Sequence, residues 1–424
     1  MRNHYSYPAF HLALMAENMS SPPVCKGDAS ERDSHSDSES CASSQTSTDR
    51  YEHEPYESFV HKAHSLLSSL FPNDVPIEME RMAGGSYNRV VGGTLRHNST
   101  DPIRVILRIP RGDYLRPADE VAVMRYLTEI FLSQKVFHFD PTSDNVNSRR
   151  PYMVLSRLRG RCLEPVYSEM PFENKKQVVC SVARLLGKFS NVSFETIGTL
   201  QARSEDENGV AIGQAWNQMD HWFPWAEGTG PPPALSRSIA SYLEERWSYL
   251  IDEEQRRNPG DSFEARYTIA FRAAASKLPI PNSDIQARIV LFHTDFAPRN
   301  IFVDEDMGEI TGVLDWDRAA SAPVEAAWTI PAWLCDKTAG GSNQLEWESP
   351  DKIPDDPRAA ELRELFFKEI GNVIPDFVDV VRKSKLIHDL LLFARLWLPT
   401  VEIIDRANEF LKGMGVDVSP RPCM

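Results

Sequence analysis

The residues best suited to chemistry lie between positions 291 and 317, in the stretch LFHTDFAPRNIFVDEDMGEITGVLDWD. This stretch places a histidine, an asparagine and five aspartates between short apolar runs. Asp295 and Asn300 are five positions apart, and Asp315 follows a second apolar run. Carboxylate and amide oxygens are the ligands that Mg2+ prefers in proteins. The spacing therefore indicates a metal site with a further carboxylate beside it.

Two apolar segments in this stretch, residues 300–304 and 309–315, are expected to pair as a β-hairpin, because the intervening EDMG is typical of a turn. A turn centred between Met307 and Gly308 places Asn300 opposite Asp315. Opposed residues in an antiparallel pair have Cα atoms about 4.5–5.5 Å apart. Asn300 and Asp315 would then hold the metal at the open end of the hairpin, and Asp295 would reach the same place from the preceding loop.

The helices and strands predicted to position these residues differ between the two halves of the chain. ESFVHKAHSLLSSLF has apolar residues at helical spacing, and MERMAGGSYNRVVGGTL and DPIRVILRIPR are typical of β-strands. RPADEVAVMRYLTEIFL predicts a helix with a proline in its first turn, and PYMVLSRLRG predicts a short strand followed by a connector. From about Pro171 onward the patterns are mostly helical. A small mixed half therefore precedes a larger helical half.

Glu120 lies on the apolar stripe of the helix predicted over residues 116–132, together with Met124 and Leu127. A carboxylate on a buried helix face requires a partner, since an unpaired buried charge is strongly unfavourable. Glu120 is therefore expected to pair with a cation.

Bulk composition limits the classes of function. The 424 residues are 42% hydrophobic and 25% charged, and the formal net charge is −15. Such an acidic chain is poorly suited to binding nucleic acid. The six cysteines are widely spaced, without a pattern typical of zinc sites. The sequence also lacks the run of about eighteen apolar residues that a membrane span requires. We predict a cytoplasmic protein with reduced thiols and with neither nucleic-acid nor membrane partners.

The first 55 residues form a segment of different composition. Over residues 1–58 there are ten acidic and four basic residues, so this region carries −6 of the net charge of −15. Serine and acidic residues dominate, and few large apolar side chains are present to offset the entropy of ordering. We predict a disordered tail over residues 1–55, either a phosphorylatable regulatory segment or a leader without a specific partner.

A set of motifs resembles the aminoglycoside phosphotransferase and choline kinase family, whose members are relatives of the protein kinases. HTDFAPRN at 293–300 and DWD at 315–317 resemble the HxDxxxxN and (I/L)DW(E/D) signatures of that family. AGGSYNRVV resembles its nucleotide-covering loop, RVILRIPR its third strand, and SVARLLGKFS and FETIGTL two later elements. The match covers roughly residues 56–415 in the right order.

The resemblance implies an α+β, protein-kinase-like fold of two lobes. It places a small β-rich N-lobe over residues 56–158 and a larger, mainly helical C-lobe over residues 159–424, with the catalytic loop and the metal-binding hairpin in the C-lobe. It also implies ATP and Mg2+ as cofactors and transfer of the γ-phosphoryl group to a hydroxyl of a small molecule. The predicted partners are therefore a nucleotide and an unidentified small-molecule acceptor.

The resemblance assigns roles to individual residues. Asp295 is the catalytic base or an orienting group, and Asn300 and Asp315 hold the metal. His293 supports the loop through its ring nitrogens rather than transferring protons. The residues expected at the nucleotide are Gly84, Gly85, Ser86, Arg108, Glu120, Ser156 and Leu158.

Two positions depart from the family pattern. Arg108 stands where most relatives carry a lysine that contacts the nucleotide phosphates and pairs with a helix glutamate, here Glu120. An arginine keeps the positive charge but presents a planar fork of donors. Ala297 occupies the position two residues after Asp295 where a basic residue or histidine is common. Arg299 is predicted to restore a cation beside the transferred phosphoryl group and is counted among the catalytic residues.

These departures leave other functions open. The chain is interpreted as a small-molecule kinase, with a nucleotide-binding but inactive regulator as the alternative. A metal-dependent hydrolase using His293, Asp295, Asp315 and Asp317 is a third possibility, although such sites usually contain more histidine. Acidic residues without an assigned role are interpreted either as contacts for an amine-bearing acceptor or as ordinary solvent-exposed side chains. The acceptor therefore stays undetermined, as does the oligomeric state.

Overall fold

The computed structural model describes residues 54–72, 77–82, 88–96, 101–111, 117–128, 133–142, 150–203, 206–213, 237–260, 262–278, 288–304, 306–317, 319–334, 349–396 and 401–418. The chain is divided into two units, Met1–His53 and Glu54–Met424. All of the described residues belong to the second unit. The predicted disordered tail therefore lies, except for its last two residues, outside the described residues.

A five-stranded antiparallel sheet forms the N-terminal part of the second unit, in the order β1-β2-β3-β5-β4. Its central strand β3, at the position where the sequence predicted a strand, buries Val105, Leu107 and Ile109 on one face. The strands are β1 (Ile77–Arg81), β2 (Asn88–Leu95), β3 (Ile103–Pro110), β4 (Val136–Asp140) and β5 (Tyr152–Ser156).

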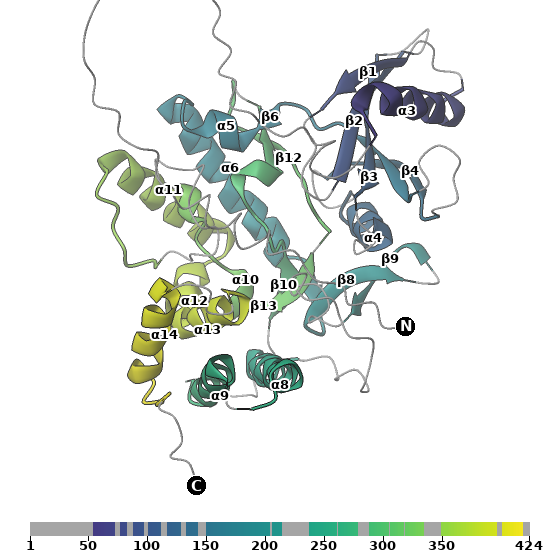
Figure 1. Cartoon of the computed structure of the whole chain (residues 1–424). Helices are drawn as coiled ribbons and strands as arrows, with labels where there is room; N and C mark the ends of the chain where they lie inside the picture. The colour runs from purple at the N-terminus through teal and green to yellow at the C-terminus, as the bar shows by residue number, and fades with distance from the viewer. Residues whose placement is uncertain are drawn as a thin grey trace, which may run out of the picture. The chain divides into compact units, whose positions relative to one another are not determined.

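Two helices cover the two faces of this sheet. α3 (Tyr56–Leu70) packs Phe59 and Leu67 against the face that contains Val105 and Leu107. α4 (Pro117–Thr128) packs Met124 against the opposite face, where Met153 is buried. Figure 1 shows α3 beside β1 and β2, and α4 on the side of the sheet that faces β8. The predicted helices at both places are confirmed, and α4 brings Glu120 under β3.

The second half of the unit contains more β-structure than the sequence patterns predicted. A five-stranded sheet has the order β7-β10-β13-β8-β9, and a three-stranded sheet has the order β12-β11-β6. Several of these strands are only two to four residues long, so they are too short to show a clear alternation of apolar residues. The strands are β6 (Arg161–Cys162), β7 (Ser193–Phe194), β8 (Gly198–Arg203), β9 (Asp206–Gly213), β10 (Ile289–Phe292), β11 (Ile301–Val303), β12 (Ile310–Val313) and β13 (Ala320–Pro323).

Helices form most of the other described elements of this half, and several begin at residues that cap their free N–H groups. Ser238 accepts a hydrogen bond from the N–H of Ser241 at the start of α8, and Asp356 precedes α11, whose first residue is Pro357. The helices are α5 (Leu163–Tyr167), α6 (Phe172–Ser190), α8 (Ile239–Arg257), α9 (Phe263–Ala275), α10 (Val324–Ala327), α11 (Pro357–Val373), α12 (Phe377–Lys383), α13 (Lys385–Leu396) and α14 (Val401–Gly413), with the 3-10 helices η1 (Pro298–Asn300) and η2 (Ala332–Leu334).

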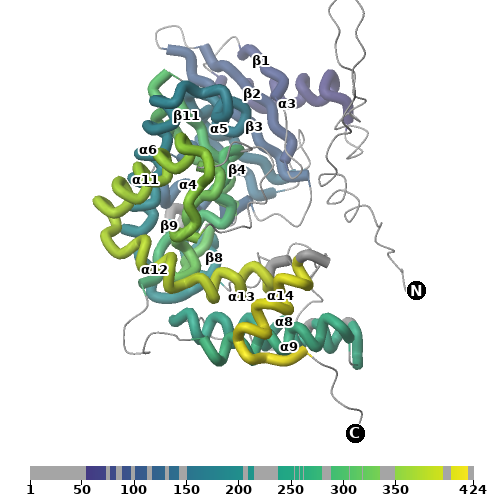
Figure 2. The backbone as a smooth tube through the Cα atoms, turned by 90° about the vertical axis from the view of Figure 1, so that its left-hand side faces the viewer, coloured from purple at the N-terminus to yellow at the C-terminus, as the bar shows by residue number. Residues whose placement is uncertain are grey.

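These helices bury two hydrophobic clusters. The larger one joins α6, α11 and α12 to β10, β11 and β12, and it contains Trp316 and Trp333. The second cluster lies among α8, α9, α13 and α14, with Phe271 stacked between Trp247 and Phe393. Figure 2 shows α13 and α14 alongside α8 and α9. The larger cluster lies directly beneath the strands that carry the motif residues, so it fixes their backbone.

Within the described part of the chain, no helix is both long enough and apolar enough to cross a bilayer.

Buried His388 on α13 makes stability depend on pH. Burial lowers the pKa of His388 to about 4 from an ordinary 6.5, although Asp389 and the backbone of Trp328 oppose the shift. The unfolded chain therefore binds more protons between these pH values, and the stabilisation by neutral His388 is complete above pH 6.5 and lost as the pH falls through 4. We expect a loss of roughly 3 kcal/mol in the free energy of unfolding over this range.

The variant His388→Asn isolates this effect, because asparagine keeps a donor but does not titrate. Urea unfolding at a series of pH values should show a shallower decrease in stability below pH 6.5 for the variant than for the parent chain. Parallel decreases for the two proteins would contradict the prediction.

Candidate active site

His293 ties the catalytic loop to the hairpin that follows it. Strand β10 ends at Phe292, so His293 begins the loop, and its side chain is buried. The Nε2 atom lies 2.8 Å from the carbonyl oxygen of Leu314, and Nδ1 accepts a hydrogen bond from the N–H of Asp295 at 3.2 Å. Burial lowers the pKa of His293. The ring is therefore neutral, with its proton on Nε2, and both nitrogens serve to hold the loop.

The carboxylate of Asp295 is oriented from two sides. Nη2 of Arg299 donates to both of its oxygens, at 2.6 and 2.7 Å. Nδ2 of Asn300 donates to Oδ2 at 2.8 Å and to the backbone oxygen of Asp295 at 2.9 Å. Because the amide nitrogen of Asn300 is used in this way, its amide oxygen is the atom left to bind a cation. The loop thus brings together the three residues that the sequence predicted for it.

The predicted register of the hairpin is wrong by one residue. Ile301 pairs with Val313, and the N–H of Leu314 donates to the oxygen of Asn300 at 2.7 Å, so Asn300 faces Leu314 rather than Asp315. The ladder also shifts between Phe302 and Val303. Such an irregularity is a tertiary feature, and counting residues from the turn could not predict it.

Asp315 reaches the site through an unusual backbone conformation. Its φ is 67°, in the left-handed region that aspartate tolerates better than most residues do. Its Oδ1 lies 3.6 Å from Nη2 of Arg108. The chain therefore turns at Asp315, directly after the hairpin, and this turn directs the carboxylate toward β3.

Arg108 pairs with Glu120, as the position of both residues implied. Nη1 of Arg108 forms an ion pair with Oε1 of Glu120, and both side chains are nearly buried, at 11% and 4% exposed. Burial by itself would lower the pKa of Arg108, but Glu120, Asp315 and Asp317 outweigh it and raise this pKa. The guanidinium is therefore fully charged and bridges α4 to Asp315.

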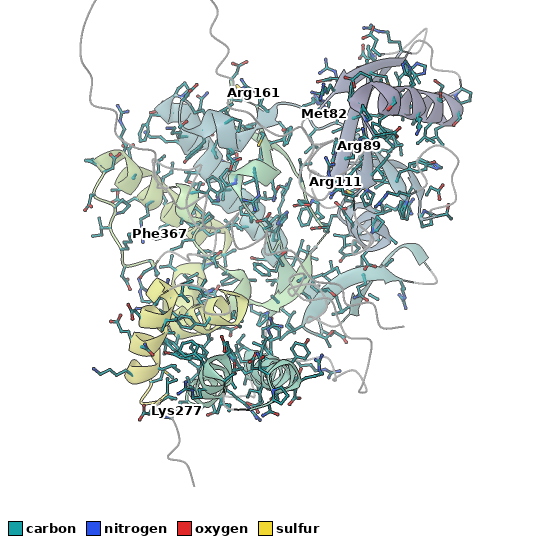
Figure 3. All side chains as sticks on the ribbon, in the orientation of Figure 1. Met82, Arg89, Arg111, Arg161, Lys277 and Phe367 are labelled. Carbon is teal, nitrogen blue, oxygen red and sulfur yellow. The ribbon has the colours of Figure 1, made fainter. Side chains whose placement is uncertain are left out.

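Gly84, Gly85 and Ser86 lie outside the described residues, so their predicted contact with phosphate stays a prediction. The strands on either side are described. β1 and β2 pair antiparallel from Ile77 with Leu95 to Arg81 with Val91. Figure 3 labels Met82 and Arg89, which flank this segment, and Arg111, whose Nε donates to the oxygen of Asn88 at 3.2 Å.

Ser156 and Leu158 lie where β5 leads into the second half of the unit. The Ser156 hydroxyl accepts the N–H of Lys135 at 2.8 Å, and its carbonyl accepts Nε2 of Gln134 at 2.8 Å. The side chain of Leu158 packs on Gly312 of β12, where an added Cβ would lie 2.5 Å from Leu158 Cδ1. The Leu158 contact holds the connector against β12, which ends at Val313, two residues before Asp315. The nucleotide contacts of Ser156 and Leu158 stay predictions.

Trp316 has no role predicted from the sequence, yet the structure places it under the site. Its side chain is 2% exposed, and Nε1 donates to the oxygen of Val313 at 3.0 Å. Its ring packs edge-on against His293, with centroids 4.6 Å apart, and against Phe189. The tryptophan between two aspartates in the DWD motif was the available signal, because a large apolar residue there must be buried.

The donor set is one that suits magnesium. Asn300 and Asp315 would supply an amide and a carboxylate oxygen, and Mg2+ commonly takes one or two protein ligands with the rest from phosphates and water. Among the described residues, no group of three or more histidines, cysteines, aspartates or glutamates is arranged to hold a metal by itself. His293, which the hydrolase interpretation required as a ligand together with three carboxylates, uses both of its ring nitrogens in contacts with the backbone, and this geometry disfavours that interpretation.

Comparison with known families agrees with this geometry. A sequence model described as the phosphotransferase enzyme family (APH) matches residues 78–326, which is more than half of the chain. The chain belongs to the phosphotransferase enzyme family. The match runs from β1 through α10 and includes the catalytic loop, the hairpin and the Arg108–Glu120 pair. A comparison with curated proteins found no match.

Several solved structures are similar over most of their length. Aminoglycoside phosphotransferase APH(2'')-Ib bound to ADP is 12% identical, with 84% of this chain and 98% of that chain covered and a TM-score of 0.45. The GDP complex of aminoglycoside 2'-phosphotransferase-IIIa is 14% identical, with 84% and 97% covered and a TM-score of 0.44. A putative aminoglycoside phosphotransferase from Ralstonia eutropha is 13% identical, with 84% and 96% covered and a TM-score of 0.42. These likenesses carry no argument about the acceptor.

Proposed function

We propose that this family member is an ATP- and Mg2+-dependent kinase that transfers the γ-phosphoryl group to a hydroxyl of a small molecule. The observation that carries the proposal is the arrangement around Asp295. Its carboxylate is held by Arg299 and Asn300 at one end of a short loop, and Asp315 and Arg108 lie at the end of the adjacent hairpin. Phosphoryl transfer needs mainly this kind of positioning and charge neutralisation.

Each side chain has a part in the proposed reaction. Asp295 accepts the proton of the acceptor hydroxyl, whose oxygen forms a bond to the γ-phosphorus as the bond to the leaving nucleoside diphosphate breaks. Arg108 contacts the nucleotide phosphates, and Glu120 holds it there. Bound magnesium, held by Asn300 and Asp315, would supply neutralisation of the phosphate charge.

Calorimetric titration with a non-hydrolysable ATP analogue, with and without Mg2+, tests the nucleotide site. We expect binding that strengthens when Mg2+ is present, followed by turnover when ATP is offered with a panel of hydroxyl compounds. Absence of nucleotide binding under every condition would refute the proposal.

A nucleotide-binding but inactive regulator is the second candidate, and one contact favours it. Arg108 lies 3.6 Å from Asp315, so its charge would compete with a cation for one of the proposed ligands. This candidate predicts nucleotide binding that does not depend on Mg2+ and no turnover with any hydroxyl compound of the panel. Turnover of a single acceptor would rule it out.

Arg299 gives a prediction specific to this chain. Because Arg299 contacts both oxygens of Asp295, Arg299→Ala frees the carboxylate to rotate, and misplacement of a catalytic group slows the chemical step. We expect the turnover number to fall about 10- to 100-fold while the affinity for the ATP analogue stays unchanged.

The matched control is Arg382→Ala, which removes an exposed arginine of α12 that pairs with Asp379 on the same helix and with Asp351 before α11. This control should leave both the turnover number and the nucleotide affinity unchanged. If Arg299→Ala turns over a confirmed acceptor as fast as the parent chain does, Arg299 has no catalytic role.

A further inference from the structure

Two adjacent carboxylates on α4 are both buried. Asp119 is 8% exposed and Glu120 is 3% exposed. Consecutive residues of a helix point about 100° apart, so the two side chains face different neighbours. Glu120 faces β3 and binds Arg108. Asp119 faces the second half of the unit, and the proposed reaction gives it no role.

The partner of Asp119 is the backbone of β8. Its Oδ1 accepts a hydrogen bond from the N–H of Ala202 at 2.9 Å. Two residues earlier on the same strand edge, the N–H of Leu200 donates to the oxygen of Ala319 at 2.9 Å, just before β13 begins at Ala320. β8 extends past the start of β13 at this point, so the carboxylate of Asp119 takes the place of a β13 carbonyl as the acceptor of the Ala202 N–H. Asp119 thereby continues the hydrogen-bond ladder beyond β13.

The sheet that Asp119 joins adjoins the loop of the proposed catalytic residues. β8 pairs with β13, which starts three residues after Asp317, and β13 pairs with β10, which ends next to His293. α4 contacts both β8 and β9, and Figure 1 shows it between β3 on one side and the β8–β9 hairpin on the other. One helix thus links the strand of Arg108 to the sheet that leads into the catalytic loop.

We propose that Asp119 is a positioning residue, which fixes α4 to the β8–β9 hairpin and thereby sets Arg108 and Glu120 relative to Asp315. The inference rests on the proposed function, because it assigns Arg108 to the nucleotide phosphates. The distance of 3.6 Å between Arg108 and Asp315 depends on where α4 holds Glu120. Loss of the Asp119 contact releases α4 on the side away from β3. Glu120 on α4 then no longer holds the guanidinium of Arg108 where it would contact the nucleotide phosphates.

The test compares a ligand that has phosphates with one that lacks them. In the full chain, the dissociation constants of a non-hydrolysable ATP analogue with Mg2+ and of adenosine are measured for the parent, Asp119→Ala, Asp119→Asn and Ala202→Pro. Asparagine keeps the oxygen that accepts the Ala202 N–H, and proline removes that N–H from the hairpin side. Ala202→Pro keeps the proposal testable if Asp119→Ala does not fold.

We expect Asp119→Ala and Ala202→Pro to weaken binding of the ATP analogue about 10-fold and to leave adenosine binding unchanged, with Asp119→Asn close to the parent. Equal affinity of the parent and both disrupting variants for the analogue would overturn the inference alone. Equal weakening of analogue and adenosine would also overturn it, because that result indicates general loosening of the fold. A parent chain that binds neither ligand would overturn the proposed function, and this inference with it.

Discussion

Replacement of Asp315 by asparagine is expected to abolish the contribution of Mg2+ to nucleotide binding. The carboxylate is one of two proposed protein ligands, and the neutral amide is a weaker ligand for a hard cation. Loss of an outer-shell partner of a metal commonly weakens binding about 10- to 100-fold, and loss of a direct ligand should exceed that. The measurement is calorimetric titration of an ATP analogue at fixed Mg2+ concentrations.

The same variant has an opposite effect when magnesium is absent. Asp315 lies 3.6 Å from Arg108, so its neutralisation frees the guanidinium to interact with phosphate. Without Mg2+ the analogue should therefore bind Asp315→Asn as tightly as the parent, or more tightly. The control is Glu309→Gln, an exposed carboxylate at the other end of the hairpin, which should keep the full Mg2+ effect. An intact Mg2+ effect in Asp315→Asn would remove Asp315 from the metal site.

Replacement of Asp295 by asparagine is expected to have the largest effect on turnover. The amide cannot accept the proton of the acceptor hydroxyl, and general-base catalysis contributes roughly 10²- to 10⁴-fold. The amide group also places an N–H₂ against donors from Arg299 and Asn300, which now bind the carboxylate. We expect the turnover number for a confirmed acceptor to fall by roughly 10²- to 10⁴-fold.

Nucleotide affinity separates a catalytic role for Asp295 from a structural one. Asp295 is not a proposed ligand of the nucleotide, so the dissociation constant of the ATP analogue with Mg2+ should stay unchanged in Asp295→Asn. Asp306→Asn, an exposed aspartate in the turn of the adjacent hairpin, is the control and should keep normal turnover. A turnover number within a few-fold of the parent value would mean that Asp295 is not the base.

The two halves of the unit differed in how well their sequence patterns predicted structure. Alternating residues in β3 and helical spacing in α3 and α4 identified these elements, since each is long enough to show its period. The five-stranded sheet of the second half was missed, because strands such as β7 and β10 contain only two and four residues. Short strands gain their stability from neighbours in the sheet rather than from their own pattern.

The sequence by itself predicted that Asp295, Asn300 and Asp315 belong to one candidate site and that Glu120 requires a cation, while the roles of these residues stay predictions from the family resemblance. Residue types and spacing sufficed for this, because His293, Asp295 and Asn300 lie within a single short loop. The tertiary structure decided the register of the hairpin, the left-handed turn at Asp315 and the contact between Asp119 and Ala202. These features depend on how strands far apart in the chain pack together, and local residue patterns do not contain that information.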